Sequence, residues 1–353
     1  MGGVQGEDGQ MWNRRFRPAG AALSLVLTAA LLAACSPRSA PKDEKFTVRF
    51  TEVIHSIFYA PQYVAQAKGF FADEGLEVVS STAQGSDRGA AALLAGTADI
   101  AMVGPETAVF VHNQDSPVKV KIFAQLTARD GSFLLAREKP EGEFSWTDVK
   151  GKSIIGWRPG SMPQLVAEAI LRQHGLDPET DLEYIDNLAA TAMVGAFLSG
   201  QGDYIQVFEP SVSELVQGGH AYLATYLGAD YGEMPYTAFL ATDKFIAEHP
   251  DVIQRYTNAI YRAQKYIFEA DPKVVAQEVA QFFEGTDVEI LASSIQRYRD
   301  EGGWVHTPVM KPEDYEKLQD LMIAGGVLEP DQRAPFDAIA TNRFAEEAVR
   351  QVK

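Results

Sequence analysis

Cysteine is almost absent from this 353-residue chain, which has one, Cys35. A single thiol cannot form an internal disulfide, an iron–sulfur cluster or a thiolate–zinc site. Histidine is also scarce, and the six residues (positions 55, 112, 174, 220, 249 and 306) do not have the spacing of a zinc motif such as His-Glu-x-x-His. The sequence therefore predicts neither a metal site nor a cofactor.

Basic residues are outnumbered, because 31 Lys and Arg stand against 48 Asp and Glu, for a formal charge of −17. Such a chain repels nucleic acid and anionic lipid, so we exclude nucleic acid as a partner and expect membrane contact through an anchor only. The chain is long enough to bury a full core and to form two domains.

A hydrophobic run of membrane-spanning length is missing as well. The apolar stretch that follows Arg14, Arg15 and Arg17 has roughly fifteen residues, fewer than the ~20 that a spanning helix needs, and it ends at Leu32-Ala-Ala-Cys35. A basic start, a short apolar middle and small residues before a break are typical of an export signal. The Leu-Ala-Ala-Cys ending resembles a bacterial lipobox, in which the cysteine is acylated. We therefore expect a lipoprotein signal peptide at 1–34, lipidation of Cys35, a linker at 35–44, and an exported protein anchored to the outer face of the cytoplasmic membrane.

Beyond residue 45, expected strands alternate with expected helices. Residues 45–50 alternate apolar and polar side chains, Pro61 opens a helical pattern, and strands follow at 75–79 and 99–104, with a helix at 86–94 between them. Ser86 and Asp87 are the candidate N-caps of that helix. This alternation favours an α/β fold with largely parallel sheets.

The pattern then repeats about one hundred residues later. Pro61-Gln-Tyr-Val-Ala-Gln-Ala67 is echoed by Pro163-Gln-Leu-Val-Ala-Glu-Ala169, and Leu94-Ala-Gly-Thr-Ala-Asp-Ile100 by Leu198-Ser-Gly-Gln-Gly-Asp-Tyr204, at offsets of 102 and 104. Chance similarity between two strand–helix units is the alternative. We expect two lobes, lobe I at 45–138 plus 236–353 and lobe II at 139–235, with further helices at 273–284, 288–300, 311–324 and 336–352.

A ligand is expected at the carboxyl ends of the strands, where ligands bind in open α/β sheets. The loops there are 52–60, 84–87 and 104–107 in lobe I, and 157–162, 186–190 and 208–211 in lobe II. They hold more carboxylates than basic residues, and they are rich in aromatic rings, including Phe58 and Phe208. Carboxylates beside aromatic faces suit a cationic or N–H-rich ligand. Arg158, Ser161 and Thr107 leave an anionic ligand open.

Each candidate also has a structural interpretation. Asp87 suits a helix N-terminus, Trp157 suits core packing at a strand end, and His55 suits a structural histidine. Glu106 and Glu209, at matching places in the two lobes, suit solvated surface acids.

Three segments carry a family resemblance. Tyr59-x-x-x-Tyr63-Val-Ala-Gln-Ala-Lys-Gly-Phe-Phe71, Glu74-Gly-Leu-Glu-Val78 and Leu93-Leu-Ala-Gly-Thr-Ala-Asp-Ile100 are similar to the SsuA/THI5-like (NMT1-like) substrate-binding family. The resemblance implies a two-lobe periplasmic-binding-protein-like fold, in which each lobe is a mainly parallel sheet flanked by helices and the ligand cleft lies between the lobes. By position it implies ligand contacts at His55, Tyr59, Glu106, Thr107, Trp157, Ser161, Asn187 and Glu209, to which the aromatic content of the loops adds Phe58.

The resemblance implies the solute receptor of an ABC importer, with a permease and its ATPase as partners; we expect a monomer and no catalytic residues. The charge pattern favours a small nitrogenous solute, aminopyrimidine-like or amidine- or guanidinium-like. An alkanesulfonate or nitrate-like anion is the alternative. An enzyme of the THI5-like pyrimidine synthase type would need a cysteine-rich iron site, which one cysteine cannot build. A sensor or adhesin is the third possibility.

Overall fold

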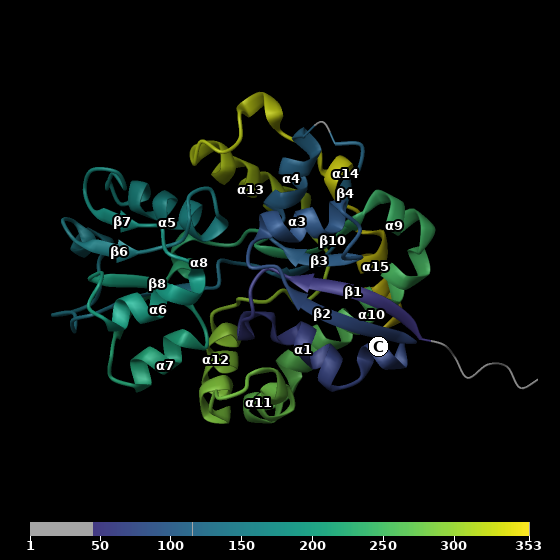
Figure 1. Ribbon diagram of the computed structural model, residues 1–353, viewed down its shortest axis with the longest axis horizontal. Coiled ribbons are helices and arrows are strands. Elements are labelled where there is room, and N and C mark those ends of the chain that lie inside the picture. The colour runs from purple at the N-terminus through teal and green to yellow at the C-terminus, as the bar shows by residue number, and fades with distance from the viewer. Residues whose placement is uncertain (1–44, 115, 353) are drawn as a thin grey trace, which may run out of the picture. The chain divides into compact units, whose positions relative to one another are not determined.

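The computed structural model describes residues 45–114 and 116–352 (Figure 1). The expected signal peptide at 1–34, Cys35 and the linker at 35–44 lie outside the described residues. Within the described part of the chain, no helix is both long enough and apolar enough to cross a membrane.

The first sheet has five strands in the order β2-β1-β3-β10-β4. Their bounds are Phe46–Glu52 for β1, Leu76–Thr82 for β2, Ile100–Val103 for β3, Val120–Thr127 for β4 and Thr237–Thr242 for β10. β1 runs parallel to β2 and β3, with Phe50 opposite Ser80 on one side and Ile100 on the other. β10 is antiparallel to β3 and β4. The parallel half presents the carboxyl ends of β1 and β3 at one edge.

The second sheet has the corresponding order, β7-β6-β8-β5-β9. The bounds are Ser132–Ala136 for β5, Ser153–Ile155 for β6, Glu183–Ile185 for β7, Tyr204–Phe208 for β8 and Tyr222–Tyr226 for β9. β6 is parallel to β7 and β8, whereas β5 is antiparallel to β8 and β9. The expected α/β fold is confirmed. Both sheets are mixed, because β5 and β10 enter their sheets against the direction of the parallel strands.

β5 corrects one detail of the expected domain division, which put residues 45–138 in lobe I. The strand pairs with β8 and β9, in the sheet formed by residues of lobe II. The chain passes from one sheet to the other at Ala128–Gly131, which we call the first crossover segment, and returns through Gly232–Tyr236, the second crossover segment. An apolar strand carries no sequence signal for the sheet that it joins. The lobe boundaries otherwise remain a prediction.

Helices flank both sheets (Figure 1). Those before β10 are α1 (Ala60–Ala67), α2 (Phe70–Asp73), α3 (Ser86–Leu94), α4 (Glu106–Asn113), α5 (Met162–Gln173), α6 (Ala190–Leu198), α7 (Ser211–Gln217) and α8 (Leu227–Tyr231). Those after it are α9 (Asp243–Glu248), α10 (Pro250–Glu269), α11 (Pro272–Val279), α12 (Val288–Asp300), α13 (Pro312–Ala324), α14 (Phe336–Ile339) and α15 (Arg343–Gln351). Short 3-10 turns lie at η1 (Ile57–Tyr59), η2 (Trp146–Val149), η3 (Ala280–Phe282) and η4 (Pro330–Gln332).

Two helix predictions need correction. The helix expected at 336–352 is divided into α14 and α15, because Ala340 bridges to Ile122 of the first sheet and the Asn342 side chain bonds both backbone groups of Met310. The helix expected at 86–94 is present, but its N-cap is Gly85, with φ of 146°, so Ser86 and Asp87 lie in the first turn.

The repeated sequence segments occupy equivalent places in the two sheets. α1 follows β1 and α5 follows β6, and each has a proline in its first turn. The second pair of segments leads from α3 into β3 and from α6 into β8. Since β1 and β6 hold the same position in their sheets, the repeat reflects two copies of one strand–helix plan.

The C-terminal helices contact both halves. α13 packs against α4 and α5, and α12 packs against η1 and α7. Residues beyond β10 therefore support the loops of both sheets at the place where a ligand is expected.

Candidate functional site

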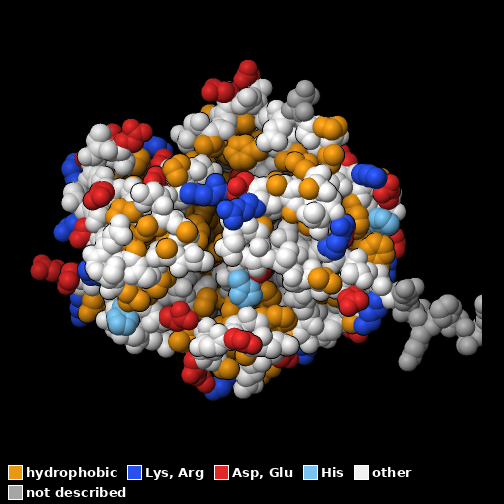
Figure 2. Space-filling view, viewed as in Figure 1, with side chains coloured by type: hydrophobic (Ala, Val, Ile, Leu, Met, Phe, Trp, Pro, Cys, Tyr) orange, Lys and Arg blue, Asp and Glu red, His pale blue; other side chains and the backbone are white. Residues whose placement is uncertain are grey.

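The carboxyl-end loops of the two sheets touch each other directly. Ser56, after β1, donates its hydroxyl to the backbone oxygen of Glu209, after β8, at 2.8 Å. Arg158, after β6, pairs with Asp87 of α3 at 2.7 Å, although both side chains are more than half exposed. Basic and acidic side chains lie together between α3 and α5 in Figure 2. We call the region enclosed by these loops and the crossover segments the interlobe site.

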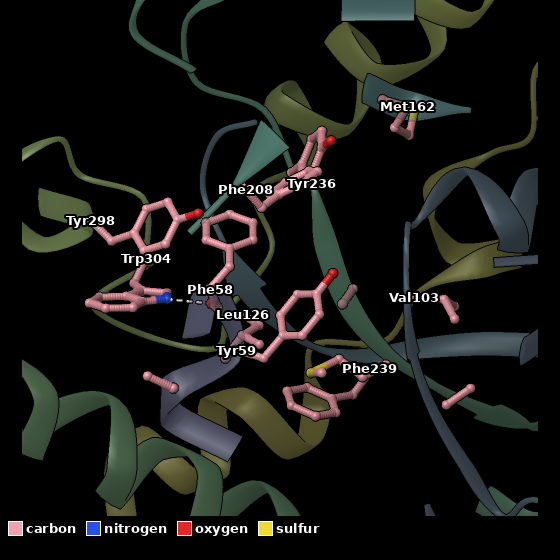
Figure 3. Close-up of a cluster of buried hydrophobic side chains, with 14 of the residues drawn as sticks. Phe58, Tyr59, Val103, Leu126, Met162, Phe208, Tyr236, Phe239, Tyr298 and Trp304 are labelled. Atoms are coloured by element: carbon pink, nitrogen blue, oxygen red, sulfur yellow. Dashed lines mark hydrogen bonds between the residues drawn. The ribbon is translucent and has the colours of Figure 1, made fainter. Parts of the chain in front are cut away.

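Aromatic rings form the base of the interlobe site (Figure 3). Phe58 is fully buried, with its ring 4.7 Å from that of Tyr298 and 6.0 Å from that of Phe208, and its backbone oxygen accepts the Trp304 indole N–H at 2.7 Å. A Cβ at Gly131 would lie 2.5 Å from the Phe58 ring, so only glycine fits there. The contacts of Phe58 favour a role in packing the first crossover segment over the expected ligand contact.

Glu106 and Thr107 begin α4 and face this region from the first sheet. Glu106 is 4% exposed, and neither its Oε2 nor the Thr107 hydroxyl has a hydrogen-bond partner. Burial raises the pKa of the Glu106 carboxyl to about 7, while its own backbone N–H, Ser86 and the positive charge of Arg158 act against that shift. A buried carboxyl with an unpaired oxygen is costly, and a donor supplied by a ligand would remove that cost.

Asp130 lies on the first crossover segment and Tyr236 on the second. The two segments are joined by a hydrogen bond of 2.9 Å from Met234 N to Ala128 O. Asp130 is 1% exposed, and its Oδ1 accepts both the backbone N–H and the hydroxyl of Ser132. Burial raises the pKa of Asp130 to about 7. The Tyr236 hydroxyl is the donor beside Asp130, and the hydrogen bond between them lowers the pKa of the carboxyl somewhat.

Tyr59 lies close to Glu106, Asp130 and Tyr236. It is buried, and burial followed by the charges of Glu52, Glu106 and Asp130 raises the pKa of its hydroxyl. Asp130 and Glu106 also raise the pKa of Tyr236, so both carboxyls lie within electrostatic reach of both tyrosines. In Figure 3 the Tyr59 hydroxyl points toward the region bordered by Tyr236, Met162 and Val103. Sequence reasoning did not single out Asp130 or Tyr236 as site residues.

The candidates of the second sheet use their polar atoms within the protein. Trp157 donates its indole N–H to Gln206 O at 3.1 Å, with its ring edge-on to Phe208 at 5.2 Å, and Ser161 donates its hydroxyl to Arg158 O at 2.7 Å. Asn187 is exposed in the loop after β7. The Trp157 ring, half-buried beside the interlobe site, remains available to a ligand as an apolar surface.

Glu209 differs from the expected surface acid and from the expected ligand contact. It is 1% exposed, and Oε1 accepts the Arg297 Nε–H and the Ser213 hydroxyl, while Oε2 accepts the Ser213 N–H, all at 2.9 Å. Burial raises the pKa of Glu209, and Ser213 and Arg297 counteract it. These contacts favour a structural role. Arg297 is 88 residues away in the sequence, so the pairing had no local signal.

His55 is likewise held by the protein. Its Nδ1 bonds Glu52 Oε1 and its Nε2 bonds Phe282 O, both at 2.8 Å, and the bond to Glu52 raises the pKa of the imidazole. His55, Glu52 and Tyr63 line a separate pocket of about 300 Å³ at the end of β2. Within residues 45–114 and 116–352, no group of three or more His, Cys, Asp or Glu side chains is placed to hold a metal ion.

Comparison with known proteins agrees with this architecture. Residues 57–273 match the family described as NMT1/THI5 like, and the chain is 36% identical over 340 residues to YtlA of Bacillus subtilis (strain 168), which is named as a binding protein. That match covers 96% of this chain and 99% of YtlA.

The chain belongs to the NMT1/THI5-like family.

Two further proteins that are similar to this chain are named for different functions. The 4-amino-5-hydroxymethyl-2-methylpyrimidine phosphate synthase of Candida albicans (strain WO-1) is 23% identical over 287 residues, covering 75% of this chain and 80% of the synthase. The periplasmic nitrate-binding protein NrtA from Synechocystis PCC 6803 superposes with a TM-score of 0.73 at 17% identity, covering 88% of this chain and 90% of NrtA. The likeness to NrtA shows that this NMT1/THI5-like chain has the periplasmic-binding-protein fold.

Proposed function

We propose that this chain is the solute receptor of an ABC importer and that it binds a small nitrogenous solute, aminopyrimidine-like or amidine- or guanidinium-like, in the interlobe site. Membership of the NMT1/THI5-like family, extensive identity to a binding protein and the periplasmic-binding-protein fold support the receptor role. The solute favours the form in which both sheets contact it, and this closed form is what the permease and its ATPase would recognise.

One observation supports the choice of solute above the others: Glu106 Oε2 is buried without a hydrogen-bond partner. An N–H group of the solute would pair this oxygen and favour the ionised carboxylate. A charge-assisted hydrogen bond of this kind contributes roughly 1.5–3 kcal/mol. Half-buried Trp157 offers a ring face to the rest of a planar or cationic solute, at ~0.5–2 kcal/mol.

An anionic solute is the alternative, and nitrate is what NrtA is named for. Here the buried carboxyls of Glu106 and Asp130 oppose an anion, because an ionised carboxyl repels a negative charge and burial strengthens that repulsion. Arg158, the nearby cation, is engaged by Asp87. Catalysis is the second alternative, supported by the distant Candida synthase; turnover of a bound pyrimidine would establish it.

The cellular setting belongs to the same proposal. Acylation at Cys35 would anchor an exported, monomeric receptor beside its permease, with residues 35–44 as the linker. Incorporation of labelled palmitate into the wild-type chain and its loss in Cys35→Ser would support the anchor. Labelling that survives the substitution would contradict it.

A thermal-shift screen tests the receptor and the solute class together. The purified chain is melted with 4-aminopyrimidine, benzamidine, methanesulfonate or nitrate. A ligand at one hundred times its Kd adds ~2.7 kcal/mol to the unfolding free energy, which is a readily measured shift. We expect one or both nitrogenous compounds to raise the Tm. A rise with the anions alone would contradict the solute class, and no rise with any of the four would count against the receptor proposal.

A further inference from the structure

We propose that His55 is a pH-sensitive link between the first sheet and residues 280–287, which we call the strap, and that protonation of His55 strengthens the attachment of the strap. The strap consists of η3 and the turn that leads to Asp287, the N-cap of α12. This inference goes beyond the proposed function and does not depend on the solute, because it concerns the ligand-free chain.

The strap connects two helices that contact different halves of the molecule. α11 packs against α1, which follows the first strand of the first sheet, and α12 packs against η1 and against α7 of the second half (Figure 1). Within the strap, the Thr286 hydroxyl donates to Glu214 Oε1 of α7 at 3.3 Å. A change in the attachment of the strap therefore acts at the junction of the two halves.

His55 reaches the strap from the end of β1. Its Nε2 lies 2.8 Å from Phe282 O of the strap, and its Nδ1 lies 2.8 Å from Glu52 Oε1. Glu52 is 4% exposed, and its carboxylate also accepts the Tyr63 hydroxyl at 2.6 Å and the Thr82 hydroxyl at 3.0 Å. Because α1 and β2 both hold this carboxylate, it is a fixed acceptor for one nitrogen of the imidazole.

The two acceptors beside His55 require two N–H groups. A backbone oxygen and a carboxylate can only accept, so both bonds form together when each ring nitrogen carries a proton. The Tyr63 hydroxyl lies 3.0 Å from Nδ1, but its one proton is donated to Glu52 Oε2. A neutral imidazole has a single N–H, and the charged acceptor Glu52 retains it, because hydrogen bonds to charged groups are the stronger ones. Loss of the proton therefore removes the bond to Phe282 O.

Aromatic contacts set the size of this effect. The Phe283 ring lies 4.7 Å from the imidazole, and the Phe282 ring is stacked on Tyr63 at 5.3 Å. These rings stay in contact in either charge state of His55. The pocket of about 300 Å³ that His55 lines gives the imidazole room to turn once a bond is lost. Deprotonation is thus expected to loosen the strap without detaching it.

The charge of His55 changes near neutral pH. The hydrogen bond to Glu52 raises the pKa of the imidazole above its ordinary 6.5, although burial acts against the shift. Burial also raises the pKa of Tyr63 well above its ordinary 10, so this neighbour on α1 stays neutral. The neighbours on β2 and on the strap carry no charge; they are Thr82, Phe282 and Phe283. The stabilisation from His55 is complete below pH 6.5 and is lost as the pH rises through the raised pKa.

Hydrogen exchange of the ligand-free, full chain tests the inference. The backbone N–H groups of Phe283 and Thr286 donate within the strap, to Ala280 O and Phe283 O. We expect their protection factors to fall about threefold from pH 6 to pH 9, a modest loss because the His55 side chain is 42% exposed. The protection factors of β10, in the interior of the first sheet, should stay constant. The midpoint of the fall should coincide with the titration of the His55 imidazole followed by NMR.

Two histidine variants identify the group responsible. His55→Gln should remove the pH dependence of the strap, whereas His306→Gln, at a histidine that stacks on Phe268 at 4.0 Å, should retain the wild-type fall. Constant protection of the wild-type strap, or a fall that survives in His55→Gln, would overturn the inference. If His55→Gln does not fold, the wild-type midpoints decide, and a fall at a pH other than that of the His55 titration would overturn it. None of these results bears on the receptor role, which the solute screen tests.

Discussion

Glu106 and Glu209 occupy matching places in the two halves and have opposite surroundings. Glu106 follows β3 and Glu209 follows β8, which hold the same position in their sheets, and both side chains are buried. Glu209 accepts three hydrogen bonds, including one from Arg297, whereas Oε2 of Glu106 accepts none. At this position the second half supplies its own cation to the buried carboxyl, whereas the first half leaves one carboxylate oxygen without a hydrogen-bond partner. In the proposed receptor, recognition of the solute therefore rests on the first sheet.

The difference arises from the C-terminal helices. α12 packs against α7 and places Arg297 beside Glu209, so the chain supplies a cation there. At the first sheet, the nearby Arg158 is turned to Asp87 and only influences Glu106 through its charge. A solute N–H would have the position beside Glu106 that Arg297 has beside Glu209.

The largest expected effect comes from removing the partner of Glu209. Arg297→Met leaves a buried carboxyl without its cation, and breaking such a pair costs about 3–5 kcal/mol. We expect urea unfolding at pH 7 to show a loss of about 3 kcal/mol, since Arg297 is 28% exposed and water offsets part of the cost. Arg299→Met, on the same helix but with its guanidinium bonded to Ala270 O, is the matched control. An equal loss of unfolding free energy in both variants would show that Arg297 does not stabilise the chain through its pair with Glu209.

The second-largest effect is expected in the pH dependence of the unfolding free energy of the ligand-free protein. The pKa of Glu106 is raised by burial to about 7 from its ordinary 4.5, so between these values the folded chain holds a proton that the unfolded chain has lost. Each pH unit in that window lowers the unfolding free energy by about 1.4 kcal/mol. Glu106→Gln should therefore gain about 2 kcal/mol relative to wild type between pH 5 and pH 7, measured by urea unfolding at both values. A parallel pH dependence in wild type and variant would contradict the raised pKa of the buried Glu106 carboxyl.

The smallest effect is expected at the contact between the loops. The Arg158–Asp87 pair is exposed on both sides, and such pairs contribute about 0–1 kcal/mol and weaken with salt. Arg158→Gln should change the unfolding free energy by less than 1 kcal/mol. It should also remove a cation that lowers the Glu106 pKa, so the pH midpoint of benzamidine binding should move upward. A downward movement would contradict the placement of Arg158 near Glu106.

Much of the fold could be predicted from local sequence, and the partnerships of the site could not. Alternation, proline in first turns and the repeated segments located β1, α1, β3 and their counterparts, because these signals act over a few residues. Glu106 could be singled out because Gly104-Pro105 marks the end of β3. Arg297 meets Glu209 only after the chain has passed through both sheets, and Asp130 lies in a short Arg-Asp-Gly-Ser stretch that resembles an ordinary turn. Burial and the absence of a partner are properties of the folded chain.

The most direct test is calorimetric titration of benzamidine at pH 7 into the wild-type chain, Glu106→Gln and Glu209→Gln, with the recovered probe checked for chemical change. The account predicts one-to-one binding of unaltered benzamidine, a Kd raised about thirtyfold by Glu106→Gln, equivalent to about 2 kcal/mol, and little change with Glu209→Gln. Equal binding by wild type and Glu106→Gln, a larger loss with Glu209→Gln, or conversion of the probe would contradict it.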